Sequence, residues 1–391
     1  MSASLLDHDP VLTPAQVEFR RQVRAFFAED RVRELAEEIA GYPVGTEAAL
    51  LPVYRWLGER GWLAPNWPVE YGGAGLGAVE AAIVTEEMTL AGIPDDVHVL
   101  SIDIVGLFLL LKGTEQQKRA HLPALAAGER IATVLFTEPE AGSDLAALRT
   151  RAVRDGDGWR LSGSKVYNMK SQYGDVALCA ARTSDSPVGM HGITLFLLPL
   201  RSPGVHVEPV PSYANDRFNL VVIDGVRLTE ADVIGRVDDG WALMNEMLQL
   251  ERTGIDFHAK ARRLLDLVLR RAAETGRLAD PAYAIPLAEL DAKLRAGHAL
   301  AWQMVRDLGE HNPDPVASAM SKWYVTELFQ PILTAAADID GMDALLTAWD
   351  GDAPALGQLE AGYRFGPSHR LASGTSEVML MLIATNGLGL L

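Results

Sequence analysis

Acidic side chains, a proline, a glycine and two hydroxyl groups lie close together in residues 136–144. An apolar run of strand-like composition, residues 131–135, leads directly into this segment. Proline and glycine favour a sharp loop, in which the hydroxyls of Thr137 and Ser143 would lie beside exposed backbone amides. Such a loop suits a polar ligand that forms hydrogen bonds. Taken alone, the segment is as compatible with an ordinary turn that ends a strand.

Glu251 is a carboxylate within a largely apolar helical stripe. The members of this stripe recur at helical spacing: Trp241, Met244, Met247, Leu248, Ile255 and His258. A carboxylate in such surroundings costs free energy unless it is paired, and desolvation is expected to raise its pKa toward neutrality, where a general base works best. The alternative is a structural acid that pairs with an arginine at a subunit contact.

Residues 136–144 resemble the Thr-Glu-Pro-x-Ala-Gly-Ser-Asp signature of the acyl-CoA dehydrogenase family of flavoproteins. The resemblance extends over nearly the whole chain. Further segments that are similar to family motifs follow in the family's order: residues 60–75, 113–118, 158–165, 192–196 and 374–378. Each motif alone is a weak signal, but by the ordered series the chain is identified as a member of that family.

The resemblance implies α,β-dehydrogenation of an acyl-CoA thioester. A carboxylate would abstract the α-proton while the β-hydrogen leaves as hydride to N5 of FAD, and the protein would supply geometry and electrostatics. In most of the family the base is the glutamate before the C-terminal Gly-Thr, where this chain has Ser373. Some members place the base on an early helix of the C-terminal bundle, just before an arginine, and Glu251 followed by Arg252 matches that arrangement. The resemblance therefore implies Glu251 as the base, while the Ser373 backbone amide could still polarise the thioester carbonyl.

The same resemblance implies FAD as the cofactor and three segments that contact it. The FAD-binding residues implied in this way are Leu135, Phe136, Thr137, Gly142, Ser143, Tyr167, Met169, Gly374, Thr375 and Glu377. Tyr167 keeps an aromatic wall against the flavin ring. Met169 lacks the hydroxyl that the family places against flavin N5, and Ser171 could substitute for it.

Two elements of the family's adenine-dinucleotide site are absent. Residues 276–284 stand in place of an Arg-x-x-Phe-Gly segment, and they resemble a bacterial lipid- and sterol-catabolic branch but lack its arginine near Ala284. Residues 349–354 replace a Gly-Gly-x-Gly motif. Because a diphosphate needs hydrogen-bond donors or cations, these losses leave a second reading open, a flavin-poor or non-catalytic partner subunit of a heterotetrameric acyl-CoA dehydrogenase.

The net charge bears on the partners of the protein. The 391 residues carry a formal net charge of −17, which disfavours nucleic acid and anionic membrane surfaces as partners. It also argues mildly against a third reading, a carrier-protein thioester as the substrate, because carrier proteins are usually acidic. The resemblance implies a homo- or heterotetramer with an electron-transfer flavoprotein as the electron acceptor.

Apolar runs and cysteine content bear on the compartment. The longest notable apolar run, residues 104–111, is far shorter than the roughly 20 residues that span a bilayer, and no signal peptide is apparent. The single cysteine, Cys179, excludes an intrachain disulfide and fits a reducing compartment. We therefore expect a cytoplasmic protein without a membrane span. The histidines lack a metal-ligand spacing such as His-x-x-x-His, so no metal is predicted.

Three regions of different periodicity must position these residues. Residues 1–130 are helical in pattern, and Thr13 followed by Pro14 predicts the start of a helix. Residues 131–238 form short alternating stretches separated by turns, with a hairpin predicted over residues 150–161. Residues 239–391 are helical again. This order predicts an α+β fold, and the resemblance implies an N-terminal α-helical domain, a middle β-barrel and a C-terminal four-helix bundle.

Overall fold

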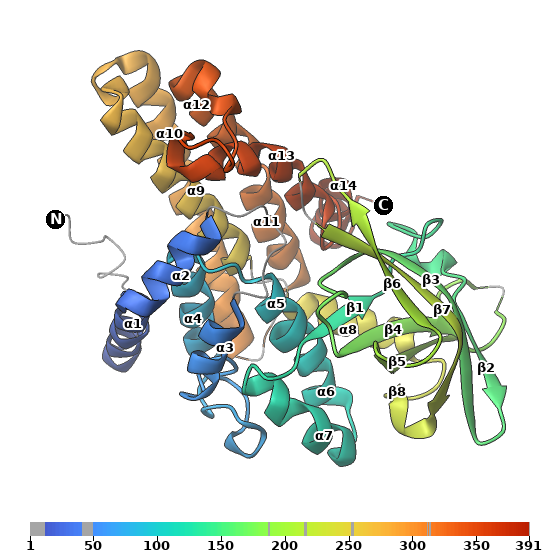
Figure 1. The fold of residues 1–391 in the computed structure, drawn as a ribbon. Coiled ribbons are helices and arrows are strands. Elements are labelled where there is room, and N and C mark those ends of the chain that lie inside the picture. The colour runs from blue at the N-terminus through green and yellow to red at the C-terminus, as the bar shows by residue number, and fades with distance from the viewer. Residues whose placement is uncertain are drawn as a thin grey trace.

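The computed structural model describes residues 12–40, 50–186, 188–214, 217–251, 254–310, 312 and 314–390, except for the side chains of residues 217 and 247–251. Helices come first along the chain, a sheet follows, and helices return (Figure 1). This order confirms the predicted α+β fold with three successive regions. The domain limits placed after residues 130 and 238 stay a prediction.

The N-terminal region is helical. Its main helices are α1 (Pro14–Phe27), α2 (Asp30–Ala40), α3 (Leu51–Gly58), α4 (Ala78–Leu90), α5 (Asp96–His98), the π-helix η4 (Val99–Gly106), α6 (Leu107–Lys112) and α7 (Glu115–Ala126). Helix α1 begins after Thr13 as predicted, because the Thr13 hydroxyl accepts a hydrogen bond from Gln16 N and the Gln16 side chain accepts one from Thr13 N. Helix α4 is buried over most of its length, since α1, α9 and α10 pack around it.

An eight-stranded mixed sheet forms the middle region. Its strands are β1 (Ala132–Leu135), β2 (Arg151–Asp155), β3 (Gly158–Met169), β4 (Val176–Arg182), β5 (Ile193–Pro199), β6 (Val205–Pro211), β7 (Arg217–Thr229) and β8 (Val233–Ile234). The strands pair in the order β6-β7-β3-β2-β4-β5-β8, and β1 pairs in parallel with β4. The predicted hairpin is the antiparallel pair of β2 and β3. Within the described residues, β6 and β8 are the two ends of the pairing path of this domain.

The C-terminal region is helical again. It contains α8 (Gly240–Glu251), α9 (Ile255–Glu274), α10 (Pro281–Gly309), α11 (Pro315–Thr326), α12 (Phe329–Asp340), α13 (Gln358–Leu371) and α14 (Ser376–Leu382). Helices α9 to α12 pack against one another around their own apolar core, as expected for the four-helix bundle.

The single helical stripe predicted from Trp241 to His258 is wrong. Helix α8 ends at Glu251 and α9 begins at Ile255, so the residues of the stripe are divided between two helices. Gly254 has a φ of 79°, a left-handed conformation that glycine adopts without steric cost. The helix that carries Glu251 therefore ends at this carboxylate, and a separate helix begins four residues later.

One apolar core joins the three regions. It contains residues of the N-terminal helices such as Phe108, of β4 such as Leu178, and of the C-terminal helices such as Met244 and Trp302. The strands and both helical regions thus share buried surface, which fixes how α4, η4, α9 and α10 lie relative to one another. Within the described ranges, no helix combines the length and the hydropathy that a membrane crossing needs.

Candidate functional site

Two of the predicted flavin-binding segments are hydrogen-bonded to each other. The side chain of Leu135 is fully buried at the end of β1, and the chain then enters the loop of residues 136–144. The carbonyl of Thr137 accepts a hydrogen bond from Val166 N at 3.0 Å, and the carbonyl of Phe136 accepts one from Lys165 Nζ at 3.0 Å. The loop therefore lies against β3 directly beside Tyr167.

Glu138 fixes the shape of this loop from inside. Its carboxylate accepts hydrogen bonds from Lys165 Nζ (2.8 Å), Arg149 N (2.6 Å) and Thr150 N (2.9 Å). Burial would raise the pKa of Glu138, but the Lys165 ammonium and these donors hold it below the usual value. The glutamate of the signature is thus a structural anchor, and its partner Lys165 was not identified from the sequence.

Tyr167 lies at an irregularity in the sheet. The register between β3 and β7 shifts between Lys165 and Asn168, and Tyr167 has a φ of 59°, which is uncommon for a bulky residue. Tyr167 as a whole is 61% exposed, and its ring meets Phe218 edge to face, with ring centres 6.2 Å apart. The bulge therefore holds an aromatic face toward open space, as a wall for a flat ligand requires.

Donor groups and open space accompany this ring. Ser171 is buried, and its Oγ has no hydrogen-bond partner among the described residues. Met169 is half-buried, and its carbonyl accepts a hydrogen bond from Thr133 Oγ1 at 2.6 Å. Gly142 and Ser143 are exposed, and a Cβ at Gly142 would meet no atom within 4 Å. These residues fit the isoalloxazine end of FAD, with the Ser171 hydroxyl available where Met169 has none.

The C-terminal turn precedes helix α14. Ser373 and Gly374 have φ values of 54° and 93°, and the Thr375 hydroxyl caps α14 by accepting a hydrogen bond from Val378 N at 3.2 Å. The Gly374 carbonyl accepts a hydrogen bond from the buried Lys322 Nζ at 2.8 Å. Glu377 is exposed, and a backbone amide of α14 together with the Thr375 hydroxyl lowers its pKa. The contacts in the turn thus give Thr375 a capping role and leave the Glu377 side chain at the surface.

A cavity of about 100 Å³ lies against Ser373. Helices α4, η4, α9 and α10 form its walls. Its lining residues are Trp67, Ala78, Ala81, Ala82, Thr85, Val99, Ile102, Asp103, Leu107, Ile255, Asp256, Phe257, Val305, Leu308 and Ser373. The lining is mainly apolar, with two carboxylates, Asp103 and Asp256, that the sequence analysis did not single out. They escaped notice because the fold alone brings residues so far apart in the chain together.

The two carboxylates have different neighbours. Burial raises the pKa of Asp103, the negative charge of Asp256 adds to the rise, and His98 opposes it. Lys260 Nζ lies 3.4 Å from Asp256 Oδ2 and 2.8 Å from Asp95 Oδ1. Burial would lower the pKa of Lys260, but these carboxylates hold it above its usual value. Asp256 is therefore paired with a half-buried cation.

A larger cavity of about 260 Å³ lies elsewhere, between the loop after α4 and helices α9 and α13. Its lining is largely apolar and includes Ile93, Leu264, Phe329 and Trp349. None of the described residues that the sequence assigned to the base or to FAD lines it. The smaller cavity is lined by Ser373, whose backbone amide the resemblance implies as a donor to the thioester carbonyl, and it is therefore the better candidate for the reacting part of a substrate.

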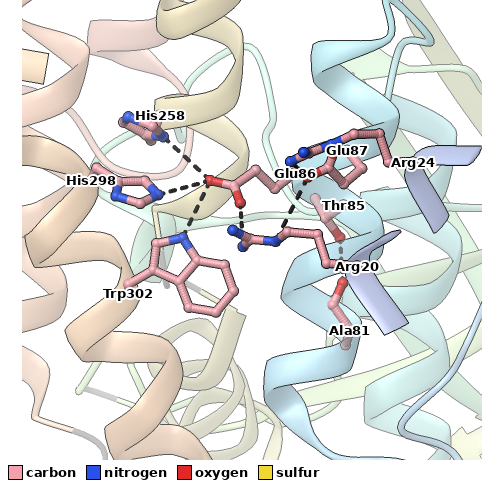
Figure 2. Close-up of polar contacts among 9 residues, drawn as sticks. All are labelled: Arg20, Arg24, Ala81, Thr85, Glu86, Glu87, His258, His298 and Trp302. Atoms are coloured by element: carbon pink, nitrogen blue, oxygen red, sulfur yellow. Dashed lines mark hydrogen bonds and ion pairs between the residues drawn. The ribbon is translucent and has the colours of Figure 1, made fainter. Parts of the chain in front are cut away.

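Glu86 lies one helical turn beyond the cavity. Figure 2 shows its carboxylate at the centre of four side chains from α1, α9 and α10: Arg20, His258, His298 and Trp302. Arg20 Nη2 lies 2.8 Å from Oε2, while Trp302 Nε1 and His298 Nε2 each lie 3.2 Å from Oε1. Thr85, Ile255 and Val305 line the cavity on α4, α9 and α10, the helices that also carry Glu86, His258 and His298, so this Glu86 cluster lies next to the cavity.

Three members of the Glu86 cluster carry metal-ligating atoms. One ligand atom each from Glu86, His258 and His298 lies within 4.8 Å of the others. However, the Arg20 guanidinium and the Trp302 N–H already interact with the same carboxylate, and a further cation would be repelled by Arg20. The cluster thus satisfies a buried acid with hydrogen-bond donors, and the expectation of no metal stays a prediction.

Glu251 is the last residue of α8, and its side chain lies outside the described residues. Its role as the base therefore stays a prediction. Helix α8 packs against β5 and η4, the π-helix that carries Asp103.

The two segments that replace absent family elements, residues 276–284 and 349–354, contain local hydrogen bonds and ring contacts. Asp280 caps α10 by accepting a hydrogen bond from Ala282 N, and the Arg277 guanidinium lies 4.8 Å from the centre of the Tyr283 ring. In the other segment, the Asp350 carboxylate accepts hydrogen bonds from the amide and hydroxyl of Thr347. One cation therefore remains near the missing arginine, whereas an acid occupies the place of the missing glycines. The donor set fits a diphosphate less well than it fits a flavin ring.

Comparison with known proteins gives a consistent result. The acyl-CoA dehydrogenase N-terminal, middle and C-terminal domains match residues 13–129, 133–226 and 238–388. Acyl-CoA dehydrogenase FadE26 of Mycobacterium tuberculosis is 32% identical, over 97% of this chain and 98% of its own length. The solved Tcur3481-Tcur3483 steroid ACAD is 30% identical with a TM-score of 0.87, over 97% of this chain and 98% of that chain. The ChsE4-ChsE5 complex from Mycobacterium tuberculosis is 31% identical with a TM-score of 0.87 over the same shares.

Proposed function

Since the chain belongs to the acyl-CoA dehydrogenase family, we propose that it catalyses FAD-dependent α,β-dehydrogenation of an acyl-CoA thioester. The observation that carries the proposal is the cavity beside Ser373, at the turn where the family resemblance locates the reacting centre. Its apolar walls suit an acyl chain. Its volume of about 100 Å³ is below the roughly 300–1,000 Å³ of a complete ligand site, so it would take the acyl end and not coenzyme A.

The main-chain N–H of Ser373 supports this assignment. No hydrogen bond joins it to any described residue, although Ala372 N still bonds to Ser368 O at the end of α13. An N–H without an internal acceptor can donate to a ligand, and a donor aimed at a thioester oxygen would stabilise the enolate-like charge that develops as the α-proton leaves. A main-chain donor does not depend on the side chain, so serine can replace glutamate here.

In this proposal Glu251 accepts the α-proton. The partial negative charge at the C-terminus of a helix favours a group that takes up a proton, and Glu251 ends α8. FAD, when bound, supplies the acceptor for the β-hydride. Thr137, Ser143, Tyr167 and the free hydroxyl of Ser171 would hold and orient the flavin ring.

Replacing Glu251 by glutamine tests the proposal. We expect turnover in a dye-coupled assay to fall by about 10²–10⁴-fold, the usual contribution of a general base, while FAD content and acyl-CoA binding stay near the wild-type values. Glu246 on the same helix provides a matched control, because its side chain is 52% exposed and pairs with Lys112. Full activity in Glu251→Gln would exclude Glu251 as the base.

A heteromeric enzyme is the second candidate. The acid at Asp350 and the missing arginine near Ala284 favour it, because a related subunit could complete the diphosphate site. Two similar solved structures are named for two proteins each. The protein purified alone should then be colourless and become yellow only after co-expression with a related subunit. A yellow, active homomer would contradict this candidate.

The acyl carrier and the electron acceptor complete the proposal. Coenzyme A is favoured over an acidic carrier protein because this chain carries a net charge of −17. An electron-transfer flavoprotein is the expected acceptor, and a tetramer is the expected assembly. Turnover of an acyl-CoA with an electron-transfer flavoprotein in place of the dye would test both partners together.

A further inference from the structure

We propose that Asp103 makes this enzyme selective for acyl groups that carry a hydroxyl, which donates a hydrogen bond to the Asp103 carboxylate. The inference rests on the proposed function, because it takes the cavity beside Ser373 as the acyl site. It is carried by the geometry of η4, by a buried histidine behind Asp103, and by the mixed lining of the cavity.

The π-helix η4 directs Asp103 into the cavity. Val99, Asp103 and Leu107 follow one another at intervals of four residues on or next to η4, and all three line the cavity. π-Helical turns are rare and occur frequently at functional sites. The Asp103 side chain is 36% exposed, whereas its neighbour Ile102 is only 1% exposed. The accessible part of the carboxylate therefore belongs to the cavity wall.

His98 lies behind this carboxylate. It is 3% exposed, and its Nε2 lies 2.8 Å from the carbonyl of Leu63, so this nitrogen carries a hydrogen. Its Nδ1 lies 3.5 Å from Asp103 Oδ2 and has no hydrogen-bond partner among the described residues. No donor among the described side chains or amides hydrogen-bonds to Asp103. The carboxylate thus lies beside His98 without a hydrogen bond to it and retains acceptor capacity for a ligand.

The rest of the lining determines which donor fits. Asp256 is already paired with Lys260, so Asp103 is the carboxylate that still lacks a donor. An acyl group ending in a carboxylate would place a further negative charge beside Asp103 and Asp256 and would be repelled. A plain alkyl group would desolvate Asp103 without supplying a donor, which costs free energy. A hydroxyl on a hydrocarbon chain satisfies Asp103 while its carbon atoms contact Ile102, Leu107 and Leu308.

A set of matched substrates tests the proposal. Hexanoyl-CoA, 6-hydroxyhexanoyl-CoA and adipoyl-CoA, together with their shorter homologues, differ only in chain length and in a methyl, hydroxyl or carboxylate end. We expect the wild-type protein to have the highest kcat/KM for a hydroxyacyl-CoA and the lowest for the carboxylates. In Asp103→Leu the ratio of kcat/KM for the hydroxyacyl-CoA to kcat/KM for the methyl-ended acyl-CoA should fall by about 10- to 100-fold, mainly through KM. This is the change expected when a hydrogen bond to a charged group is lost.

Two further variants make the comparison specific. Asp103→Asn keeps the shape of the side chain and should retain part of the preference for the hydroxyacyl-CoA. If Asp103→Leu does not fold, the reduced preference of Asp103→Asn tests the role of Asp103 in its place. Asp157→Asn changes an aspartate whose side chain is 95% exposed and should leave the preference unchanged. Equal substrate ratios in the wild-type protein and in both Asp103 variants would overturn the proposal. An equal loss of kcat for all substrates in Asp103→Asn would also overturn it, because Asp103 would then act at the reacting carbon.

Binding measurements separate this inference from the proposed function. Hexyl-CoA and 6-hydroxyhexyl-CoA thioethers cannot be oxidised at the α,β position by the proposed mechanism, and their dissociation constants are measured by calorimetry. Absence of turnover with every acyl-CoA would contradict the proposed function, yet tighter binding of the hydroxylated thioether that disappears in Asp103→Leu would still support the role of Asp103. Turnover without any such difference in binding or rate would contradict only the role of Asp103.

Discussion

Nζ of Lys165 lies 2.8 Å from Oε1 of Glu138, and the two side chains are 0% and 5% exposed. The same ammonium donates to the carbonyl of Phe136, so a single cation joins the side chain and the main chain of one loop to β3. The glutamate in the signature of residues 136–144 therefore shapes the loop, and contact of the Thr137 and Ser143 hydroxyls with a ligand stays a prediction.

The first prediction concerns this buried pair. Glu138→Gln leaves the Lys165 ammonium without its counter-charge in a site that water does not reach, so we expect the free energy of unfolding to fall by about 3–5 kcal/mol. Urea unfolding at pH 7 measures this loss of stability. The double variant Glu138→Gln, Lys165→Met removes both charges and should recover part of the loss. A single variant as stable as the wild-type protein would contradict the assignment.

The same pair predicts a dependence on acid. The pKa of Glu138 is lowered from 4.5 in the folded state, so its stabilising contribution is fully present above pH 4.5 and is lost as the pH falls through the lower folded-state pKa. The wild-type protein should lose more stability than Glu138→Gln over that acid range. Parallel acid titration curves for the two proteins would be inconsistent with this mechanism.

The second prediction concerns the Glu86 cluster. Burial would raise the pKa of Glu86, but His298, Arg20 and His258 lower it, so the acid is ionised and depends on these donors. Glu86→Leu removes the carboxylate and leaves Arg20 buried, with Glu87 at 3.7 Å as its remaining counter-charge among the described residues. We expect the free energy of unfolding to fall by about 3–5 kcal/mol in urea titrations.

A control and a metal titration accompany this variant. Glu18→Gln breaks an exposed ion pair with Arg21 and should change stability little. Addition of Zn²⁺ or of a chelator should leave the melting temperature of the wild-type protein unchanged, because Arg20 and Trp302 already bind the Glu86 carboxylate. A rise with Zn²⁺ that is lost in His298→Ala would mean that the cluster binds metal after all.

Local signals explain which parts of the fold the sequence predicts. The start of α1 follows from Thr13 and Pro14, and the β2–β3 hairpin follows from the turn at residues 155–158, because each depends on neighbours in the chain. The break between α8 and α9 was missed because the apolar periodicity continues across it. Gly254 was the available signal, since a glycine between two periodic segments is a common site for a left-handed turn.

The candidate site depends far more on tertiary structure. Lys165 follows Glu138 by many residues, and only the contact between the loop and β3 makes them a pair. Asp103, Asp256 and Ser373 meet in one cavity because η4, α9 and the turn before α14 converge there. No spacing rule within the sequence relates residues that three separate elements bring together. The resemblance to family motifs singled out the loop and the turn with Ser373, but it did not indicate the two carboxylates of the cavity lining, Asp103 and Asp256.

The third prediction concerns His369, which lies among aromatic rings at the end of α13. Its ring is 3.9 Å from the Phe329 ring centre, and contacts with Phe257 and Phe365 complete the enclosure. Burial, and to a smaller extent the positive charge of Lys260, lowers the pKa of His369 from 6.5 to about 3. The folded protein therefore holds this imidazole neutral throughout the mildly acidic range.

The sign of the resulting pH dependence follows from proton binding. Between pH 6.5 and pH 3 the unfolded chain binds a proton at His369 and the folded protein does not, so stability is lost as the pH falls below 6.5. This amounts to about 2 kcal/mol between pH 7.5 and 5. His258, whose pKa burial also lowers to about 3, contributes a loss of the same sign. His369→Phe keeps an aromatic ring in the enclosure and should remove about half of the combined loss from the two histidines. The loss is measured as the difference in urea unfolding free energy between pH 7.5 and pH 5. The wild-type protein and His369→Phe could instead lose equal stability between pH 7.5 and pH 5. The imidazole would then bind its proton as readily in the folded protein as in the unfolded chain, which would contradict exclusion of the charge by the aromatic enclosure.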